Sequence, residues 1–333
     1  MNVVKWFNDL INDDQRYVLP IMTHPGIEII GKTVREAVSD GHIHFDAIRA
    51  LSLKYPYSIA NTTIMDLTVE AEAFGANVIM PEDEVPTVLG RLLCSLKDVE
   101  GLKVPDMNAG RIKEYLKASK LAAENLDKPT FAGCIGPFSL AGRLYDMTEI
   151  MIAIYIEPNT IRLLLDKCTQ FILDYCLALK SSGVAGVIMA EPAAGLLSNE
   201  DCEIFSSVYI KKIVEKVQDD NFVVILHNCG NTGNCTSAMF STNSFAYHFG
   251  NNIDIIDVLN NCNDKTIIMG NIDPVRCLKM GSEKEIEEVT LSLLNAVKTY
   301  KNFIISSGCD IPPNTPLKNI EVFYSTINKF NLL

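Results

Sequence analysis

Short apolar segments alternate with longer amphipathic segments along most of the chain. The apolar segments have the length of β-strands and end near glycine or proline, whereas the amphipathic segments repeat their apolar residues about every three to four positions, as one face of a helix does. The apolar segment 77–80 completes a set of about eight expected strands. The other expected strands are 17–21, 130–134, 184–189, 223–227, 244–248, 266–269 and 302–305, and the expected helices are 4–10, 45–53, 66–74, 110–124, 160–182 and 200–217.

The alternation of strands and helices predicts an α/β protein with a parallel sheet, because each helix carries the chain back to the start of the next strand. Residues 187–189 are apolar without interruption, as in strands that are buried on both faces. About eight such units in 333 residues favour a closed (β/α)8 TIM barrel over an open doubly wound sheet. No linker or repeat divides the sequence, so we expect residues 1–333 to form a single barrel domain with an N-terminal helical extension.

The composition is that of a globular protein, with 48% hydrophobic and 21% charged residues. The formal net charge of −12 disfavours nucleic acid and anionic membranes as partners, because both repel an acidic surface. No segment is long and apolar enough for a transmembrane helix, and residues 1–9 lack the apolar core of a secretion signal. Ten cysteines in such a chain indicate reduced thiols and a cytoplasmic location.

Three potential metal ligands follow two of the expected strands. His227 and Cys229 lie two positions apart, so on an extended backbone their side chains point the same way. Cys309 follows strand 302–305 and would approach from another strand end, at the face where barrel enzymes keep their chemistry. One imidazole and two thiolates can bind zinc and leave a fourth position open, which is the pattern of catalytic zinc. The alternative is that these cysteines are small buried hydrophobic residues, as free cysteines commonly are.

Other residues near expected strand ends are candidates for the same site. Glu191 and Asp273 each precede a proline after a strand, and either could be a fourth zinc ligand or accept a hydrogen bond from a zinc-bound histidine. His24 follows the first strand and therefore points towards the same face of the barrel. Asp66 is a further pocket candidate, although an acid at the start of a helix can be only a cap. His42, His44 and His248 are expected to be structural or exposed.

The segment 136–142 runs from a strand end into a helix, so the backbone amides around Phe138 and Ser139 could bind an anion, although a plain strand-to-helix turn has the same pattern. Arg143 could pair with a sulfonate or carboxylate, although a single arginine near a helix start is commonly a surface residue. The sequence contains neither a glycine-rich nucleotide-binding loop nor a Gly-x-Ser-x-Gly nucleophile turn, so nucleotide cofactors and serine hydrolysis have no support.

Five segments of the chain, in order, resemble the methylcobamide:coenzyme M methyltransferases, a branch of the uroporphyrinogen decarboxylase superfamily. The resemblance implies a uroporphyrinogen decarboxylase-like (β/α)8 barrel in which His227, Cys229 and Cys309 hold Zn²⁺. It also implies that a separate corrinoid protein supplies methylcobamide in trans, because the chain lacks the Asp-x-His-x-x-Gly motif of proteins that carry cobamide. The segments are 66–75, 136–142, 226–231, 270–274 and 308–316, and they span about three quarters of the chain.

The resemblance also implies a reaction. A free thiol has a pKa of about 8.5 and is mostly protonated at neutral pH, whereas a thiol bound to zinc is deprotonated. The thiolate would attack a methyl group on cobalt(III) and expel cobalt(I), with zinc as Lewis acid and template. Coenzyme M, homocysteine, another small thiol or tetrahydrofolate could be the acceptor, and the sequence leaves the methyl donor and the oligomeric state open. Glu191 departs from the family, whose members often have aspartate there.

A metal-free decarboxylase of the type that founded the superfamily is the main alternative. Its essential acid would fall on Asp66, so this residue does not discriminate between the two functions. The decarboxylases have an Arg-x-x-Gly-Arg segment near the N-terminus, however, and the corresponding residues 21–28 include no arginine. A third hypothesis is a non-catalytic zinc protein or a docking partner for a corrinoid protein, and the open coordination position argues against purely structural zinc.

Overall fold

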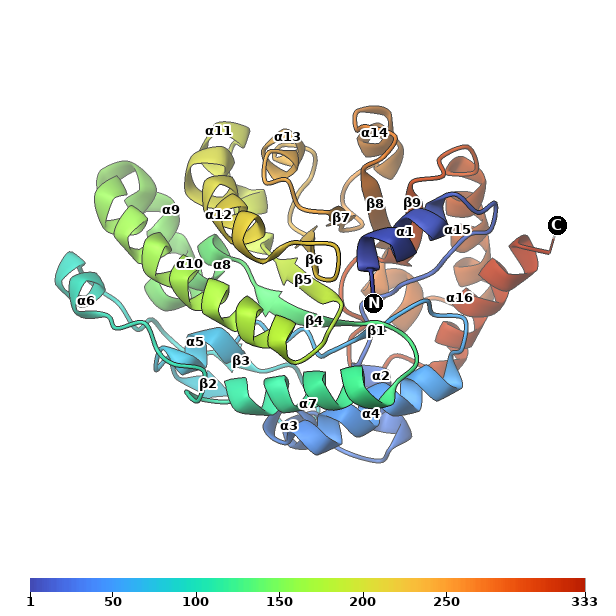
Figure 1. Ribbon diagram of the computed structural model, residues 1–333, viewed down its shortest axis with the longest axis horizontal. Coiled ribbons are helices and arrows are strands. Elements are labelled where there is room, and N and C mark those ends of the chain that lie inside the picture. The colour runs from blue at the N-terminus through green and yellow to red at the C-terminus, as the bar shows by residue number, and fades with distance from the viewer. Residues whose placement is uncertain (333) are drawn as a thin grey trace.

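The computed structural model describes residues 1–332, and its central feature is a curled sheet of seven parallel strands in the order β1-β4-β5-β6-β7-β8-β9 (Figure 1). Because the strands are parallel, their carboxyl ends meet at one face of the molecule, which is where a functional site is expected. The strands are β1 (Asn61–Thr62), β4 (Thr130–Ile135), β5 (Gly186–Ala190), β6 (Val223–Asn228), β7 (Ala246–Phe249), β8 (Ile267–Ile272) and β9 (Phe303–Ser307).

The segment 17–22 lies between the two ends of this sheet and closes it into a barrel. Val18 forms parallel bridges to both Ser58 and Ile305. The backbone N–H of Leu19 donates to the carbonyl of Ile305 over 3.0 Å, and the N–H of Ile59 donates to the carbonyl of Val18 over 3.1 Å. The predicted (β/α)8 TIM barrel is therefore confirmed, with segment 17–22 in the position of the eighth strand.

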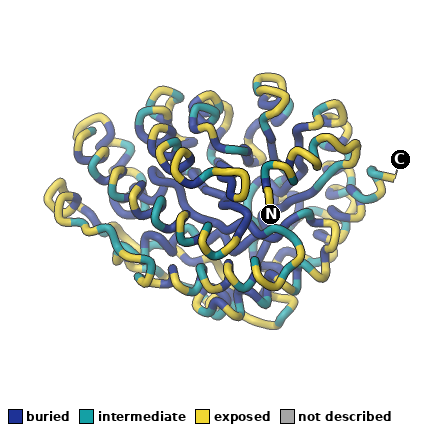
Figure 2. Tube along the Cα trace, in the orientation of Figure 1, coloured by how far each residue is buried: buried dark blue, intermediate teal, exposed yellow. Residues whose placement is uncertain are grey.

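Helices surround the barrel and bury their apolar faces against the strands (Figure 1). Figure 2 shows the resulting layers, with buried strands at the centre and exposed residues on the outer sides of the helices. Within residues 1–332, no helix combines the length and the apolar character that a membrane span needs. The helices are α1 (Val3–Ile11), α2 (His24–Ile29), α3 (Val34–Ser39), α4 (Gly41–Lys54), α5 (Val69–Ala73), α6 (Leu96–Gly101), α7 (Ile112–Asn125), α8 (Pro137–Tyr145), α9 (Met147–Ile156), α10 (Pro158–Ser181), α11 (Asn199–Cys202), α12 (Val208–Val217), α13 (Thr236–Phe240), α14 (Ile255–Asn260), α15 (Glu283–Ala296) and α16 (Leu317–Phe330), with a short 3-10 helix η1 (Pro192–Leu196) and two π-helical turns η2 (Glu203–Ser207) and η3 (Pro274–Lys279).

The apolar segment 77–80 is not a barrel strand, which corrects the sequence-based prediction. It contains β2 (Val78–Ile79), which pairs only with β3 (Thr87–Val88) in an antiparallel hairpin outside the barrel. Ile79 is exposed there, so its apolar character does not reflect burial in the sheet. The corresponding barrel strand is β1, which consists of two polar residues and therefore carries no apolar signal.

Helix α1 covers the amino-terminal end of the barrel. Val3 and Phe7 are fully buried, and the backbone N–H of Val3 donates to the carbonyl of Asp220 over 2.7 Å, just before β6. The ring of Phe7 packs against Phe131 and Phe245, with centroid separations of 5.8 and 5.2 Å. Because α1 covers this end of the barrel, the opposite face, at the carboxyl ends of the strands, remains for chemistry.

Candidate metal centre

The structure brings together the three residues that the sequence predicts as metal ligands. His227 lies near the end of β6, Cys229 follows β6 directly, and Cys309 lies just after β9. One potential ligand atom from each residue lies within 4.8 Å of the other two. His227 is buried, whereas both cysteines are half-buried. One imidazole nitrogen and two sulfur atoms form a donor set that suits Zn²⁺.

One polar atom of this cluster lacks a hydrogen-bond partner. The Nε2 atom of His227 is buried and has no hydrogen-bond partner among residues 1–332, which is unusual because a buried polar atom without a partner costs free energy. A hydrogen bond between the two thiols lowers the pKa of Cys229 and raises the pKa of Cys309 well above its usual value. The cluster therefore offers a free nitrogen lone pair next to a thiol that loses its proton readily.

A buried chain of hydrogen bonds holds the imidazole of His227 through its Nδ1 atom. The Nδ1 atom of His227 lies 2.8 Å from Nδ1 of His248, and Nε2 of His248 lies 2.7 Å from Oγ of Ser306. Burial lowers the pKa of His248 well below its usual value, so this ring is neutral. A neutral ring has one donor and one acceptor nitrogen, so His227 can donate from Nδ1 to His248, which then donates from Nε2 to Ser306. This arrangement leaves Nε2 of His227 free to accept a metal.

Sequence analysis did not identify this role of His248 and Ser306, although both residues are polar interruptions of apolar strands. His248 is level with His227 on the neighbouring strand β7, and Ser306 lies near the end of β9. Both are fully buried polar residues in mostly apolar strands. A buried polar side chain requires a hydrogen-bond partner, so polar interruptions of this kind point to neighbours of a site.

Glu191 is engaged elsewhere and lies outside the ligand cluster. Its carboxylate accepts hydrogen bonds from the backbone N–H groups of Phe138 and Ser139 over 2.8 and 2.9 Å, and from the hydroxyl of Ser206 over 2.9 Å. Desolvation raises the pKa of Glu191, and these hydrogen bonds oppose that increase. The amides at the start of α8 do bind an anion, as the sequence suggests, but the anion is this carboxylate. A side chain at Gly136 would overlap the carboxylate of Glu191, so only glycine fits there.

Asp273 also lies outside the ligand cluster. One carboxylate oxygen accepts hydrogen bonds from the backbone N–H groups of Val275 and Arg276 over 2.9 and 2.8 Å, which caps the start of η3. The other oxygen accepts a hydrogen bond from the amide of Asn251 over 3.0 Å. Thus the structure places both acid candidates for a fourth ligand in capping positions.

His24 lies beside the ligand cluster, as expected for a residue after the first barrel strand. Its Nε2 atom is 3.4 Å from the carboxylate of Asp310, the residue that follows Cys309. The Nδ1 atom of His24 and the second oxygen of Asp310 are buried and have no hydrogen-bond partner among the described residues. Sequence analysis missed Asp310, although its position next to a predicted ligand is a usable signal.

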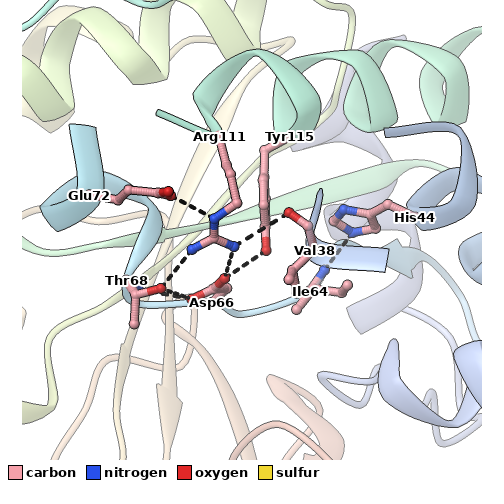
Figure 3. A network of polar contacts seen from close by, with 8 residues as sticks. All are labelled: Val38, His44, Ile64, Asp66, Thr68, Glu72, Arg111 and Tyr115. Atoms are coloured by element: carbon pink, nitrogen blue, oxygen red, sulfur yellow. Dashed lines mark hydrogen bonds and ion pairs between the residues drawn. The ribbon is translucent and has the colours of Figure 1, made fainter. Parts of the chain in front are cut away.

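Asp66 belongs to a buried network of ion pairs and hydrogen bonds (Figure 3). Its carboxylate accepts from the guanidinium of Arg111 over 2.6 Å, from the hydroxyl of Tyr115 over 2.9 Å and from the hydroxyl of Thr68 over 2.6 Å. Arg111 also donates to Glu72 over 2.6 Å. Both oxygens of Asp66 are therefore occupied, and its charge is compensated by Arg111, which sequence analysis did not identify.

The remaining candidates lie on α8. Phe138 is fully buried in the core. Ser139 and Arg143 line a cavity of about 260 Å³ between α8 and η1. The structure therefore separates the sequence candidates into three groups. One group is the ligand cluster and His24, which contacts the residue after Cys309. The others are the residues in caps and buried networks, and the residues that line the cavity at Arg143.

The comparisons with known proteins agree with this geometry. A sequence model of the family described as uroporphyrinogen decarboxylase (URO-D) matches residues 27–330. The chain is 31% identical over 270 residues to a methylcobamide:CoM methyltransferase from Methanosarcina acetivorans, with 77% of this chain and 75% of the relative covered. It is 25% identical over 290 residues to a uroporphyrinogen decarboxylase from Pseudoalteromonas translucida, with 84% and 80% covered.

Solved structures show the same fold. A methyltransferase from Methanosarcina mazei superposes with a TM-score of 0.87 at 23% sequence identity, and the match covers 98% of both chains. A B12-independent methionine synthase from Shewanella superposes less closely, with a TM-score of 0.54 at 13% identity and with 87% of this chain and 89% of that chain covered. At these identities the similarity establishes the barrel fold alone, so the reaction has to be inferred from the residues of the site.

Proposed function

Because the chain belongs to the uroporphyrinogen decarboxylase (URO-D) family, we propose that it is a zinc-dependent methyltransferase of the corrinoid-using branch. The substrates in this proposal are a methylated corrinoid protein, which brings methylcobamide in trans, and a small thiol of the coenzyme M type. The observation that carries the proposal is the cluster of His227, Cys229 and Cys309 at the carboxyl face of the barrel, in which Nε2 of His227 has no hydrogen-bond partner among the described residues.

In this proposal Nε2 of His227 and the sulfur atoms of Cys229 and Cys309 hold the zinc ion. A zinc ion bound there supplies Lewis acidity that keeps a substrate thiol deprotonated at neutral pH. His248 and Ser306 act on His227: they fix the proton on its Nδ1 atom and hold the ring so that Nε2 faces the two sulfur atoms. With only three protein ligands, a zinc ion held there would remain open to a substrate thiol.

The overall reaction is a displacement at carbon. The acceptor thiol loses its proton, its sulfur forms a bond to the methyl carbon, and the carbon–cobalt bond breaks with both electrons left on the corrinoid. A site that holds the two reactants in line converts a bimolecular encounter into a reaction between positioned groups.

A metal-free decarboxylase is less well supported. That reaction needs an accessible acid at the position of Asp66, and here both oxygens of this carboxylate are occupied by Arg111, Tyr115 and Thr68. The segment 21–28 also includes no arginine to hold the carboxylates of a porphyrinogen. The free ligand cluster has no function in such a reaction.

Zinc analysis combined with a corrinoid assay tests the proposal. We expect about one zinc per chain in purified protein, and we expect thiols to demethylate methylcobalamin, which absorbance measures as cobalt(I) forms. The variants Cys309→Ala and Cys229→Ala should lose both zinc and activity. Cys94→Ala, a substitution of an exposed cysteine, is the matched control and should retain both.

The result that would refute the proposal is carefully prepared protein without zinc in which thiols still do not demethylate methylcobalamin after zinc is added. Activity that survives in Cys309→Ala would also contradict it, because the remaining two ligands do not make a catalytic zinc site. The panel of thiols, extended to tetrahydrofolate, identifies the acceptor.

A further inference from the structure

Two further cysteines lie in contact next to the segment that carries Cys229. Cys202 is the last residue of α11, Cys235 immediately precedes α13, and both side chains are fully buried. A hydrogen bond between the two thiols raises the pKa of Cys202 and lowers the pKa of Cys235. Thiol–disulfide exchange starts from a thiolate, so Cys235 is the sulfur of this pair that reacts first.

Hydrogen bonds outside the pair hold the elements of the two cysteines together. The side-chain oxygen of Asn199, one turn before Cys202, accepts from the backbone N–H of Ala238 over 3.0 Å. The hydroxyl of Ser207 donates to the carbonyl of Ala238 over 2.6 Å and lies 3.9 Å from Sγ of Cys202. These contacts fix α11 and η2 against the start of α13, so the two sulfur atoms can join without a movement of whole helices.

Cys235 also anchors the segment that begins at the predicted metal ligand Cys229. The side-chain oxygen of Asn231 accepts from the backbone N–H of Cys235 over 3.2 Å, which folds this segment onto itself. Sγ of Cys235 lies 3.2 Å from the carbonyl oxygens of Ala194 and Leu197, at the end of η1. We call the chain between the two cysteines, 229–235, the ligand segment. Its attachment to the rest of the barrel depends on Cys235.

The ligand segment gives a small molecule a route to the sulfur of Cys235. Residues 232–234 are exposed, and Gly233 has a φ of +114°, a conformation that glycine adopts freely. Exposed segments of this kind open locally far more readily than a core does. A second pair of hydrogen-bonded thiols, Cys134 and Cys176, lies by contrast in the core between the fully buried strand β4 and helix α10.

We propose that Cys202 and Cys235 are a redox-active pair, in which a small-molecule disulfide oxidises the two thiols to one intramolecular disulfide that ties the ligand segment to α11. This inference goes beyond the proposed function, because the exchange involves neither zinc nor a corrinoid.

The exchange takes place in two steps. Cys235 loses its proton, and its sulfur attacks one sulfur of the small disulfide, whose sulfur–sulfur bond breaks to release one small thiol that takes up the proton. The sulfur of Cys202 then attacks that of Cys235, and the second small thiol leaves with the proton of Cys202. Two electrons pass from the protein to the reagent, so the two cysteines are oxidised and the small disulfide is reduced to two thiols.

Peptide mapping by mass spectrometry tests the pairing. Folded protein is incubated with the disulfide of 2-mercaptoethanol, and the remaining thiols are alkylated before digestion. We expect a link between Cys202 and Cys235 that dithiothreitol reverses. In Cys202→Ser the reaction should stop after the first step, with one 2-mercaptoethanol attached to Cys235. The core pair, Cys134 and Cys176, is the matched internal control and should stay unlinked.

Hydrogen exchange measures the effect on the ligand segment. In the oxidised protein we expect the backbone amides of 229–235 to exchange about 10-fold more slowly than in the reduced protein, because the new bond restricts the local opening that exchange requires. Helix α16 is on the far side of the barrel (Figure 1), so its amides are the control and should exchange equally in both forms.

Folded protein in which Cys202 and Cys235 stay unlinked would overturn the inference. Linkage of Cys134 to Cys176 at the same rate would also overturn it, because the cysteines would then react only after global unfolding. If Cys235 joined Cys229 instead, the pairing would be wrong. A link between Cys202 and Cys235 that leaves exchange in the ligand segment unchanged would refute the proposed tie to α11.

Discussion

At the scale of single residues, the metal centre depends on which nitrogen of His227 carries a proton. An imidazole binds metal only through an unprotonated nitrogen, and its other nitrogen is fixed by the hydrogen bond that it makes. Here that bond goes to His248, which is itself held by Ser306. The three residues are buried, so water cannot replace a missing partner.

We therefore predict that His248→Phe weakens zinc binding by about 10- to 100-fold, because His227 loses the ring nitrogen that orients it and keeps only the backbone carbonyl of residue 248, at 3.3 Å. Competition with a chromophoric chelator measures the affinity. Ser306→Ala should have a smaller effect, since Ser306 acts through His248. Tyr247→Phe is the control, because Tyr247 is on the same strand and its hydroxyl donates to the carbonyl of Phe240. Wild-type zinc affinity in His248→Phe would contradict the proposed orientation.

Glu70 gives a prediction for pH dependence. It is buried, and desolvation raises its pKa to about 7, with an opposing effect of the hydrogen bond from the N–H of Ile135. The folded state therefore holds the proton of Glu70 more tightly than the unfolded state does. The protonated side chain contributes its full stabilisation below pH 4.5, and this stabilisation is lost as the pH rises through about 7. Wild-type protein above neutral pH therefore has a buried carboxylate charge whose second oxygen has no partner among the described residues.

Glu70→Gln should remove this pH dependence, because glutamine keeps an acceptor for Ile135 and cannot ionise. We expect the free energy of unfolding of the variant, relative to wild type, to be higher at pH 8 than at pH 5.5 by about 1–3 kcal/mol. Urea unfolding at the two pH values measures it, and Glu200→Gln, at an exposed position, is the control. An equal difference at both pH values would show that Glu70 is not the group responsible.

At the scale of secondary structure elements, the network around Asp66 joins parts of the chain that are distant in sequence. Arg111 precedes α7, Asp66 follows β1, and the guanidinium of Arg111 also donates to the carbonyl of Val38 in α3 over 3.4 Å. The side chain of Asp66 is fully buried, so its charge depends on Arg111 for compensation. The network thus fixes one side of the barrel.

Removal of one partner from this network should be costly. We predict that Arg111→Met lowers the free energy of unfolding by about 3–5 kcal/mol, because it leaves the buried carboxylate of Asp66 without its cation. The double variant Asp66→Asn with Arg111→Met should recover part of this loss. Arg49→Met, which breaks an exposed ion pair with Asp46, should cost about 1 kcal/mol or less. Chemical unfolding measures all three, and a double variant that is no more stable than Arg111→Met would argue against the network.

The sequence predicts elements well where their apolar pattern reflects burial. Strands 130–134 and 302–305 overlap β4 and β9 because every position in these strands is buried. β1 was missed because its two residues are polar, and 77–80 was misplaced because a short hairpin has the same pattern as a barrel strand. Pairing partners lie far apart in sequence, so no local pattern distinguishes these cases.

The candidate site shows the same limit. The sequence predicts that His227, Cys229 and Cys309 meet, because the carboxyl ends of parallel strands share one face of the barrel. The sequence cannot show that Glu191 accepts hydrogen bonds from amides of α8. A side chain that binds the backbone of another barrel unit produces no sequence pattern, because every residue has a backbone N–H except proline. Asp310 and Ser306 do leave a signal in the sequence, but their contacts with His24 and His248 appear only once the strand ends lie side by side.

At the scale of the whole molecule, the barrel has one end for stability and one for chemistry. Helix α1 covers the amino-terminal end, where Phe7 packs between Phe131 and Phe245. The ligand cluster and the cavity at Arg143 lie at the opposite end. Substitutions at the two ends should therefore have separable effects.

We predict that Phe7→Ala lowers the free energy of unfolding by about 3–5 kcal/mol, because it leaves a cavity beneath the barrel. The folded variant should still bind about one zinc per chain, since the ligand cluster is at the opposite end of the barrel. Chemical unfolding and metal analysis on the same preparation separate the two quantities. Loss of zinc from folded Phe7→Ala protein would show that the two ends are coupled.

The contact between Gly136 and Glu191 has an evolutionary consequence. Because a side chain at position 136 would overlap the carboxylate of residue 191, the two positions cannot diverge independently. A lineage that shortens the acid to aspartate gains space beside the backbone and can then admit alanine at 136, whereas a lineage that keeps glutamate must keep glycine. An alignment of homologous chains should therefore contain glycine–glutamate, glycine–aspartate and alanine–aspartate pairs at these positions, and alanine–glutamate should be missing.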